Sequence, residues 1–185
     1  MMKSVLNDEM TFYNVALEAI ADEEILLNNL FETNHKYYPK QHYGVCNLYE
    51  TTYVYLIFKA LLQYGFEHTV FWEFPYPNNS KLHADMALLD ENGELEALIE
   101  FKLWLKDDDK AIQSDIEKLK RVEGCSRYIF VVGYGGNLEE NAEYLSRESG
   151  VLREVNKKSL KTRFYSSKEN SMIKTNLNVF MYEAL

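Results

Sequence analysis

The chain has 185 residues, of which 46% are hydrophobic and 14% aromatic, and its formal net charge is −9. This length and apolar content suit one sizeable core, so we expect residues 1–185 to form a single domain. The acidic balance argues against a protein that holds nucleic acid by bulk electrostatics, because lysine and arginine carry unspecific phosphate binding. No apolar run reaches the ~18 residues of a membrane span, and the N-terminus does not resemble a signal peptide. We therefore expect a cytoplasmic protein without a membrane partner.

Charge is distributed unevenly along the chain. Residues 1–100 contain 5 Lys and Arg against 16 Asp and Glu, whereas residues 101–185 contain 15 against 13. The cations near the C-terminus are Arg153, Lys157, Lys158, Lys161, Arg163, Lys168 and Lys174. They suit a basic face that holds a polyanion, and they equally suit an ordinary solvated surface.

Hydrophobic periodicity predicts two helices in the first third of the chain. Residues 8–32 contain an apolar stripe of period 3.6, and residues 47–64 contain a second, strongly apolar stripe that ends at Gly65. The period then changes to two, which predicts a strand at residues 68–74 that ends before Pro75.

A hairpin of two strands is predicted in residues 83–104, HADMALLDENGELEALIEFKLW. The Asn-Gly pair at residues 92–93 favours a two-residue type I′ turn, in which both central residues adopt positive φ. In this register Asp85 lies opposite Glu100, and Lys102 follows on the same face. The other face is expected to be apolar and to contain Ala84, Met86, Leu88, Ala97, Ile99 and Phe101.

The remaining elements alternate between helix and strand. Residues 108–122 predict a helix, and RYIFVVG at residues 127–133 predicts a strand that is buried on both faces. A helix at residues 138–148 and two strands at residues 159–166 and 177–183 follow. The middle of the chain is therefore expected to run helix, three strands, helix, strand, which indicates an α/β fold with a mixed sheet.

Asp85 and Glu100 repel each other in the predicted register, because opposed Cβ atoms are roughly 4.5–5.5 Å apart. A divalent cation between them turns this repulsion into affinity, and carboxylate oxygens suit Mg²⁺ or Mn²⁺. Lys102 projects on the same side, where it can orient, or help to deprotonate, the water that attacks a phosphodiester. The alternative is an ordinary solvated face, on which Glu-x-Lys is common. The apolar neighbours Leu98 and Trp104 favour a site.

This stretch and its flanking elements resemble the PD-(D/E)XK nuclease superfamily, which has the restriction-endonuclease-like fold. The resemblance covers residues 47 to about 133. It rests on Asp85, on the sequence IEFK with Glu100 and Lys102, and on the αβββαβ order. Ala84 stands where the family motif has proline. The resemblance implies that the two acids hold Mg²⁺ or Mn²⁺ and that the lysine is catalytic.

The resemblance also implies roles outside the hairpin. Glu50 matches an acid that some subfamilies place on the first helix as a further metal ligand. Its spacing from Asn47 also fits a capping box, in which the Glu50 carboxylate accepts the Asn47 N–H. Gln113 corresponds to a polar residue that some members direct into the site, although it is equally typical of a helix surface. Outside the core, residues 1–40 are expected to add a helix and residues 137–185 a β extension.

The sequence therefore predicts a Mg²⁺-dependent endonuclease-like enzyme that hydrolyses phosphodiester bonds of DNA, or of RNA. The acidic net charge predicts weak binding to nucleic acid. A recruiting protein partner, a structured substrate, or a homodimer that joins two basic faces would overcome this weakness, and the N-terminal helix is a candidate contact surface. One alternative is a non-catalytic module of this fold that binds nucleic acid or protein. Another is a metal-dependent hydrolase of a small phosphoester.

Overall fold

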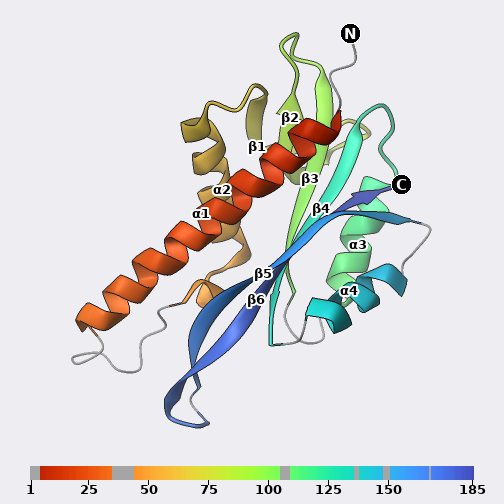
Figure 1. The fold of residues 1–185 in the computed structure, drawn as a ribbon. Helices are drawn as coiled ribbons and strands as arrows, with labels where there is room; N and C mark the ends of the chain where they lie inside the picture. The colour runs from red at the N-terminus through yellow and green to blue at the C-terminus, as the bar shows by residue number, and fades with distance from the viewer. Residues whose placement is uncertain (1–4, 35–43, 105–108, 136–137, 148–150, 167) are drawn as a thin grey trace.

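A six-stranded mixed sheet organises the fold (Figure 1). The computed structural model describes residues 5–34, 44–104, 109–135, 138–147, 151–166 and 168–185. The elements are α1 (Val5–Asn34), η1 (Val45–Asn47), α2 (Glu50–Tyr64), β1 (Thr69–Tyr76), β2 (Asn79–Leu89), β3 (Leu95–Trp104), α3 (Asp109–Leu119), β4 (Ser126–Tyr134), α4 (Leu138–Arg147), β5 (Leu152–Ser166) and β6 (Ser171–Ala184). The predicted α/β class, the order of the middle elements, the N-terminal helix and the C-terminal strands are confirmed.

The strand order in the sheet is β1-β2-β3-β4-β6-β5. The pair β3 and β4 is parallel, and the other neighbours are antiparallel. A parallel connection needs a crossover, and α3 provides it. Because α3 returns across the sheet directly after β3, it covers the alternate side chains of that strand.

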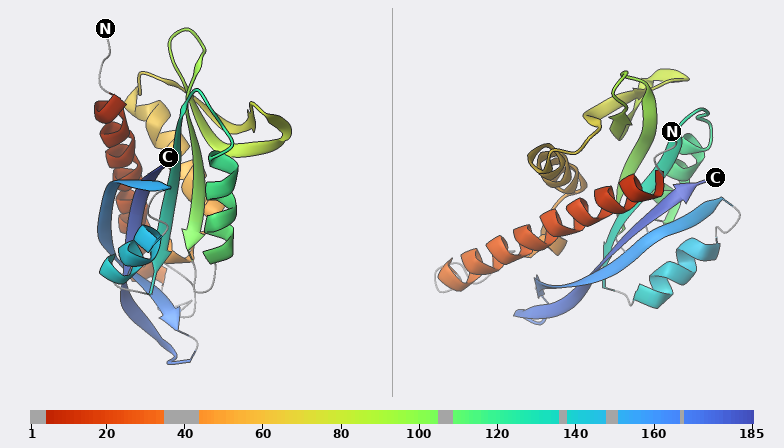
Figure 2. Two further views of the ribbon diagram at one scale, coloured as in Figure 1. Left: turned by 90° about the vertical axis from the view of Figure 1, so that its right-hand side faces the viewer. Right: turned by 45° about the horizontal axis from the view of Figure 1, so that its top comes forward.

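Helices cover both faces of the sheet (Figure 2). On one face, α1 and α2 pack against a large apolar cluster, and on the other face α3 and α4 pack against a second cluster. No helix in the described ranges is long and apolar enough to cross a membrane.

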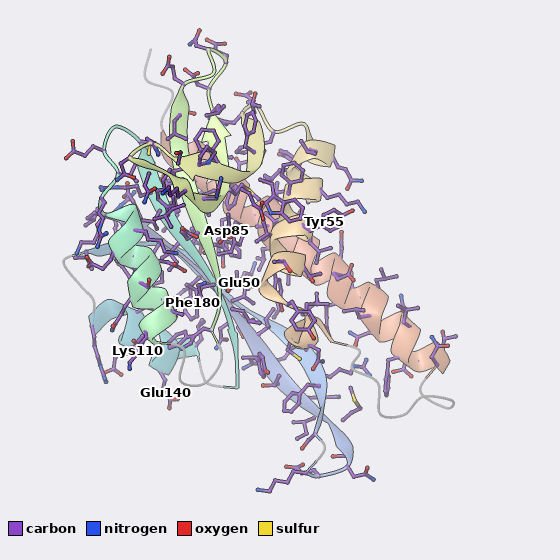
Figure 3. All side chains as sticks on the ribbon, turned by 180° about the vertical axis from the view of Figure 1, so that it is seen from behind. Glu50, Tyr55, Asp85, Lys110, Glu140 and Phe180 are labelled. Carbon is purple, nitrogen blue, oxygen red and sulfur yellow. The ribbon has the colours of Figure 1, made fainter. Side chains whose placement is uncertain are left out.

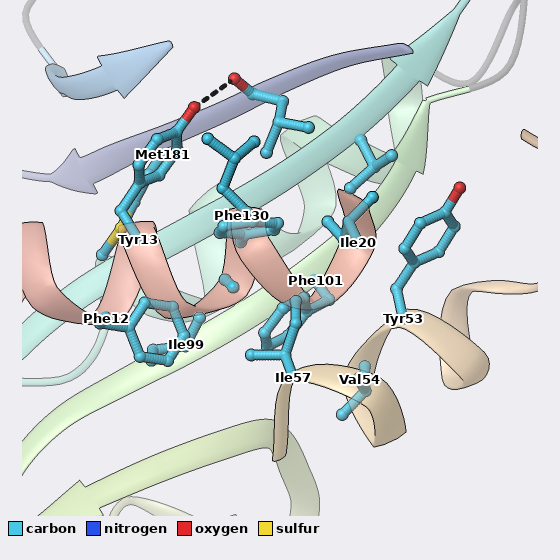
Figure 4. Packing of buried hydrophobic residues seen from close by; sticks show 14 of the residues in the cluster. Phe12, Tyr13, Ile20, Tyr53, Val54, Ile57, Ile99, Phe101, Phe130 and Met181 are labelled. Carbon is cyan, nitrogen blue, oxygen red and sulfur yellow. Dashed lines mark hydrogen bonds between the residues drawn. The ribbon is translucent and has the colours of Figure 1, made fainter. Parts of the chain in front are cut away.

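The cluster under α1 and α2 is built from aromatic and branched side chains (Figure 4). Phe130 lies at its centre, and its ring centroid is 5.2 Å from that of Phe101 and 6.2 Å from that of Phe12. Tyr13 is fully buried, and its hydroxyl donates a hydrogen bond of 3.0 Å to the Val179 carbonyl. Each large side chain buried here contributes roughly 1.5–3 kcal/mol of transfer free energy.

The hairpin loop differs from the sequence prediction. The Asp90 N–H donates to the Glu94 carbonyl (2.9 Å), and the Gly93 N–H donates to the Asp90 carbonyl (3.1 Å). Residues 91–93 therefore form a three-residue loop, and Asn92 does not have the positive φ that a type I′ turn requires. The Asp90 carboxylate accepts the N–H groups of Asn92 and Glu94, both at 2.8 Å, which favours this longer loop.

A bulge restores the predicted register beyond the loop. Leu89 pairs with Leu95, and the shift between Leu88 and Leu89 leaves Glu96 as an extra residue on β3. The predicted register is confirmed in three pairs: Met86 with Ile99, Ala87 with Leu98, and Leu88 with Ala97. The extra loop residue and the bulge thus offset each other, so the register is the predicted one on the side of the hairpin that leads to Asp85 and Glu100.

β1 extends further than predicted, because it continues through Pro75 to Tyr76. Proline is tolerated there, since β1 is an edge strand and a missing N–H breaks no pairing on its free side. Glu73 interrupts the strand with a φ of 54°, between Trp72, which pairs with Met86, and Phe74, which pairs with Ala84.

The hairpin of β1 and β2 changes face at Glu73. Met86 belongs to the cluster under α1 and α2, whereas Ala84 belongs to the cluster under α3. The prediction that Ala84 shares the apolar face of Met86 is therefore wrong. At the tip, the Asn78 amide donates to the Arg121 carbonyl (2.8 Å), so the hairpin closes over the C-terminal end of α3.

Candidate active site

Asp85 lies where β2 and β3 separate. The described backbone ladder between these strands begins at Met86 and Ile99. One step further along, the Asp85 carboxylate accepts the Phe101 N–H at 2.7 Å, so a side chain replaces a backbone partner. Burial raises the pKa of Asp85, and hydrogen bonds from Phe101 and from Glu100 oppose this rise. The separation of the strands opens a place for polar side chains inside the sheet.

Glu100 is almost completely buried, with 3% of its surface exposed. Burial raises its pKa to about 8, with Asp85 and Asp115 adding to the rise. The Tyr76 hydroxyl donates a hydrogen bond to Glu100. The raised pKa favours the protonated form of Glu100 more than in an ordinary glutamate. Asp85 and Glu100 are close enough for each to influence the pKa of the other.

Lys102 is held between two carboxylates. Its Nζ lies 3.2 Å from Glu50 Oε1 and 2.9 Å from Asp115 Oδ2, and 17% of its side chain is exposed. Burial lowers the pKa of Lys102, but the hydrogen bonds and charges of Asp115 and Glu50 outweigh burial and raise it above its ordinary value. Lys102 therefore remains an ammonium ion at neutral pH. It can orient a water or a phosphate oxygen, but it has no free lone pair with which to act as a base.

Glu50 connects α2 to the end of β3. One carboxylate oxygen pairs with Lys102, and the other accepts the Leu103 N–H at 2.9 Å. The capping-box interpretation is wrong, because α2 begins at Glu50 and its N-cap, Tyr49, makes no side-chain cap hydrogen bond. Figure 3 labels Glu50, the first residue of α2, and Asp85, on β2, in the region between the helices α2 and α3.

Asp115 is a part of the site that the sequence analysis missed. It lies on α3, is 3% exposed, and also forms an ion pair with Lys118. Its signal was present, because Asp115 stands within the apolar stripe of Ile112 and Ile116. An acid at a core-facing helix position requires a buried partner, and Lys102 is that partner.

Tyr76 is the second missed residue. No pattern in the sequence points to it, since Pro75 is expected to end the strand before it. Gln113, in contrast, was a candidate that the structure leaves on the exposed side of α3. The face of α3 that points to the sheet presents Asp115 instead.

The donor set suits a small hard cation. Within the described ranges, no three His, Cys, Asp or Glu side chains come together as a metal-binding group, so Glu50 does not join Asp85 and Glu100. Mg²⁺, however, is commonly bound through only one or two carboxylates, with waters and substrate phosphates as its other ligands. If all are ionised, Glu50, Asp85, Glu100 and Asp115 exceed Lys102 and Lys118 by two negative charges, which one divalent cation balances.

The comparisons with known proteins give no assignment. The chain matches no protein-family model, no curated protein and no solved structure. Membership of the PD-(D/E)XK superfamily therefore stays a prediction, and it depends on the hairpin residues and the order of the elements.

Proposed function

We propose that the protein is a metal-dependent nuclease that hydrolyses phosphodiester bonds of DNA or RNA, with DNA as the first expectation. The observation that supports this proposal is the pair Asp85 and Glu100, which lies beside an ammonium group held by two carboxylates. Two neighbouring carboxyl groups offer oxygen ligands to a divalent cation, and binding of the cation releases any proton that the raised pKa of Glu100 retains.

In this proposal each residue has a defined task. Asp85 and Glu100 hold Mg²⁺ or Mn²⁺, which lowers the pKa of a bound water and neutralises charge on the phosphate. Lys102 keeps its proton and orients the attacking water or the scissile phosphate. Glu50 and Asp115 fix the ammonium group in place, and Tyr76 fixes the Glu100 carboxyl.

The test is a cleavage assay with labelled single-stranded, duplex and branched DNA and RNA in Mg²⁺ or Mn²⁺. Wild type is compared with Lys102→Ala and with the control Lys110→Ala. The control removes an exposed lysine at the N-terminal end of α3 (Figure 3). We expect cleavage that needs the metal, that Lys102→Ala reduces at least a hundredfold, and that Lys110→Ala leaves intact. Equal activity of wild type and Lys102→Ala, or no cleavage of any substrate, would refute the proposal.

One observation favours the alternative of a non-catalytic scaffold. Glu100 and Asp115 are each only 3% exposed, so part of the charged cluster is as closed as an ordinary core. If the cluster is only structural, Mg²⁺ leaves the melting temperature unchanged. If it is the metal site, Mg²⁺ raises the melting temperature and Asp85→Asn abolishes the increase.

A further inference from the structure

A cleft lies between the C-terminal half of α1 and the strands β5 and β6. Its volume is about 890 Å³, which is within the range of roughly 300–1,000 Å³ typical of ligand sites. Among the described residues, those that line it are all polar or glycine. A lining of this kind suits a charged, hydrated ligand rather than an apolar one.

The wall of the cleft is a two-stranded arm that extends beyond the sheet (Figure 1). The pairing of β6 with β4 ends at Leu177, so residues 171–176 of β6 pair only with β5. An isolated two-stranded ribbon is marginally stable. Here α1 and η1 support it, and Gly44 approaches so closely that a Cβ atom there would lie 1.9 Å from the Arg163 carbonyl oxygen.

Cations are opposed on the two strands of this arm. Arg163 pairs directly with Lys174, and Lys161 stands two residues from Arg163, opposite Asn176. Like charges in opposed positions repel each other unless an anion lies between them. The Lys161 ammonium is 2.8 Å from the neutral Asn176 side chain, and Lys174 makes no ion pair with the described residues. Their positive charges therefore stay largely uncompensated.

Among the described residues, neither of the two acids that line the cleft forms an ion pair with Lys161 or Lys174. Glu24 is only 6% exposed, and its oxygens accept the Val45 N–H (2.9 Å), the Thr162 hydroxyl (2.9 Å) and the Asn28 amide (3.0 Å). Glu32 is exposed and forms an ion pair with Arg163, at 3.2 Å. Arg153 and Lys157, in contrast, form ion pairs outside the cleft, with Glu183 and Glu154.

We propose that this cleft binds the phosphodiester backbone of a nucleic-acid strand, with Lys161, Arg163 and Lys174 contacting its phosphates. The identity of the ligand rests on the proposed function. The described residues that line the cleft include no aromatic side chain for base stacking, so the contacts that they offer are to the backbone. The segment η1 connects the cleft to the candidate active site. The Val45 N–H donates a hydrogen bond to Glu24 in the cleft, and Glu50 of the active site follows three residues after Asn47.

The experiment measures binding without cleavage. Fluorescence anisotropy follows a labelled oligonucleotide in EDTA, for wild type, for Lys161→Gln/Lys174→Gln, and for the control Lys59→Gln/Lys110→Gln. Both double variants change the net charge equally, and the control lysines are exposed and outside the cleft. We expect the cleft variant to bind at least tenfold more weakly. Its slope of log K against log salt falls by about 1.4 for a single strand, as two lost phosphate contacts require.

Three results would overturn the proposal: undetectable binding by wild type, cleft-variant affinity within twofold of wild type, or an equal loss in the control. A mononucleotide or inorganic phosphate that binds as tightly as the oligonucleotide would also overturn it in favour of a small phosphate ligand. Urea unfolding of both variants confirms that they fold. Cleavage is scored separately, so cleft-dependent binding without cleavage refutes only the nuclease, and cleavage without cleft dependence refutes only the cleft.

Discussion

The two faces of β3 differ in what they bury. Ile99 and Phe101 point into the apolar cluster under α1 and α2, whereas the residues between and after them, Glu100 and Lys102, point toward α3. One strand thus supplies both a close-packed core and a buried charged network. On the first face any well-shaped apolar side chain serves, but on the second face each group needs a particular partner.

The charged face is costly to build. Removing charged groups from water costs free energy, and this cost is offset only if each group is hydrogen-bonded and paired. Proteins with such networks are often no more stable than variants with apolar replacements. The covered face nevertheless brings together Asp85, Glu100, Lys102 and Asp115. Because this arrangement is costly, a functional explanation for it is favoured over a structural one. Four substitutions test this contrast, in order of decreasing effect on the free energy of unfolding.

Phe101→Ala should produce the largest loss. The ring is 1% exposed and packs against Phe130, so its removal leaves a cavity and costs about 3–5 kcal/mol. Urea unfolding measures the change, which should be the same with and without Mg²⁺. A loss below about 1 kcal/mol would contradict the assignment of this face as the main source of stability.

Asp115→Asn should cost less stability but more function. It removes one of the two carboxylates that hold Lys102, a charged hydrogen bond worth about 1.5–3 kcal/mol. We expect kcat to fall more than tenfold while KM for the nucleic acid is unchanged, because the ammonium group is displaced and the cleft is intact. Lys118→Gln, which removes only the other partner of Asp115, should keep kcat within about threefold. Equal kcat in wild type and Asp115→Asn would contradict the positioning role.

Glu100→Gln should change how stability depends on pH. The native pKa of Glu100 is about 8 against an ordinary value of 4.5, so the folded state binds this proton more tightly than the unfolded state does. Its contribution is therefore full below pH 4.5 and is lost as the pH rises toward 8.

Glutamine does not ionise, so the stability of Glu100→Gln relative to wild type should increase steadily from pH 5 to pH 8 in EDTA. Urea midpoints across this range provide the measurement. Parallel curves for the two proteins would show that Glu100 is ionised throughout.

Lys120→Gln should have the smallest effect. Lys120 forms an ion pair with Glu117 one turn away on α3, but both side chains are solvent-accessible. Such pairs contribute about 0–1 kcal/mol, and salt screens them. The melting temperature should change little. A loss of stability as large as that of Asp115→Asn would mean that burial does not distinguish the Lys102–Asp115 pair from the Lys120–Glu117 pair.

Much of the site could be predicted from local pattern. Alternation placed Glu100 and Lys102 on one face, and opposed strands placed Asp85 beside Glu100, because a period of two leaves few other registers. The predicted two-residue loop is wrong, because hydrogen bonds from backbone N–H groups to the Asp90 carboxylate outweigh the Asn-Gly preference for a type I′ turn. The bulge at Glu96 nevertheless restores the predicted register.

Other parts depend on contacts between distant segments. Tyr76 reaches Glu100 only because the left-handed Glu73 turns the edge hairpin over α3. The extra length of β5 and β6, which builds the cleft, depends on support from α1 and η1 rather than on strand periodicity. Asp115 was the exception, since its position in the stripe of α3 was readable from the sequence.

The most direct test of the central claim is an anomalous difference map from crystals of the protein soaked in Mn²⁺. The account predicts one peak between the Asp85 and Glu100 carboxylates, at the distance of a hard-oxygen ligand, about 2.1 Å for Mg²⁺. Asp85→Asn should lose the peak. A map with no peak at this pair, from crystals that bind Mn²⁺ elsewhere or not at all, would contradict the assignment of the charged face of β3 as a metal site.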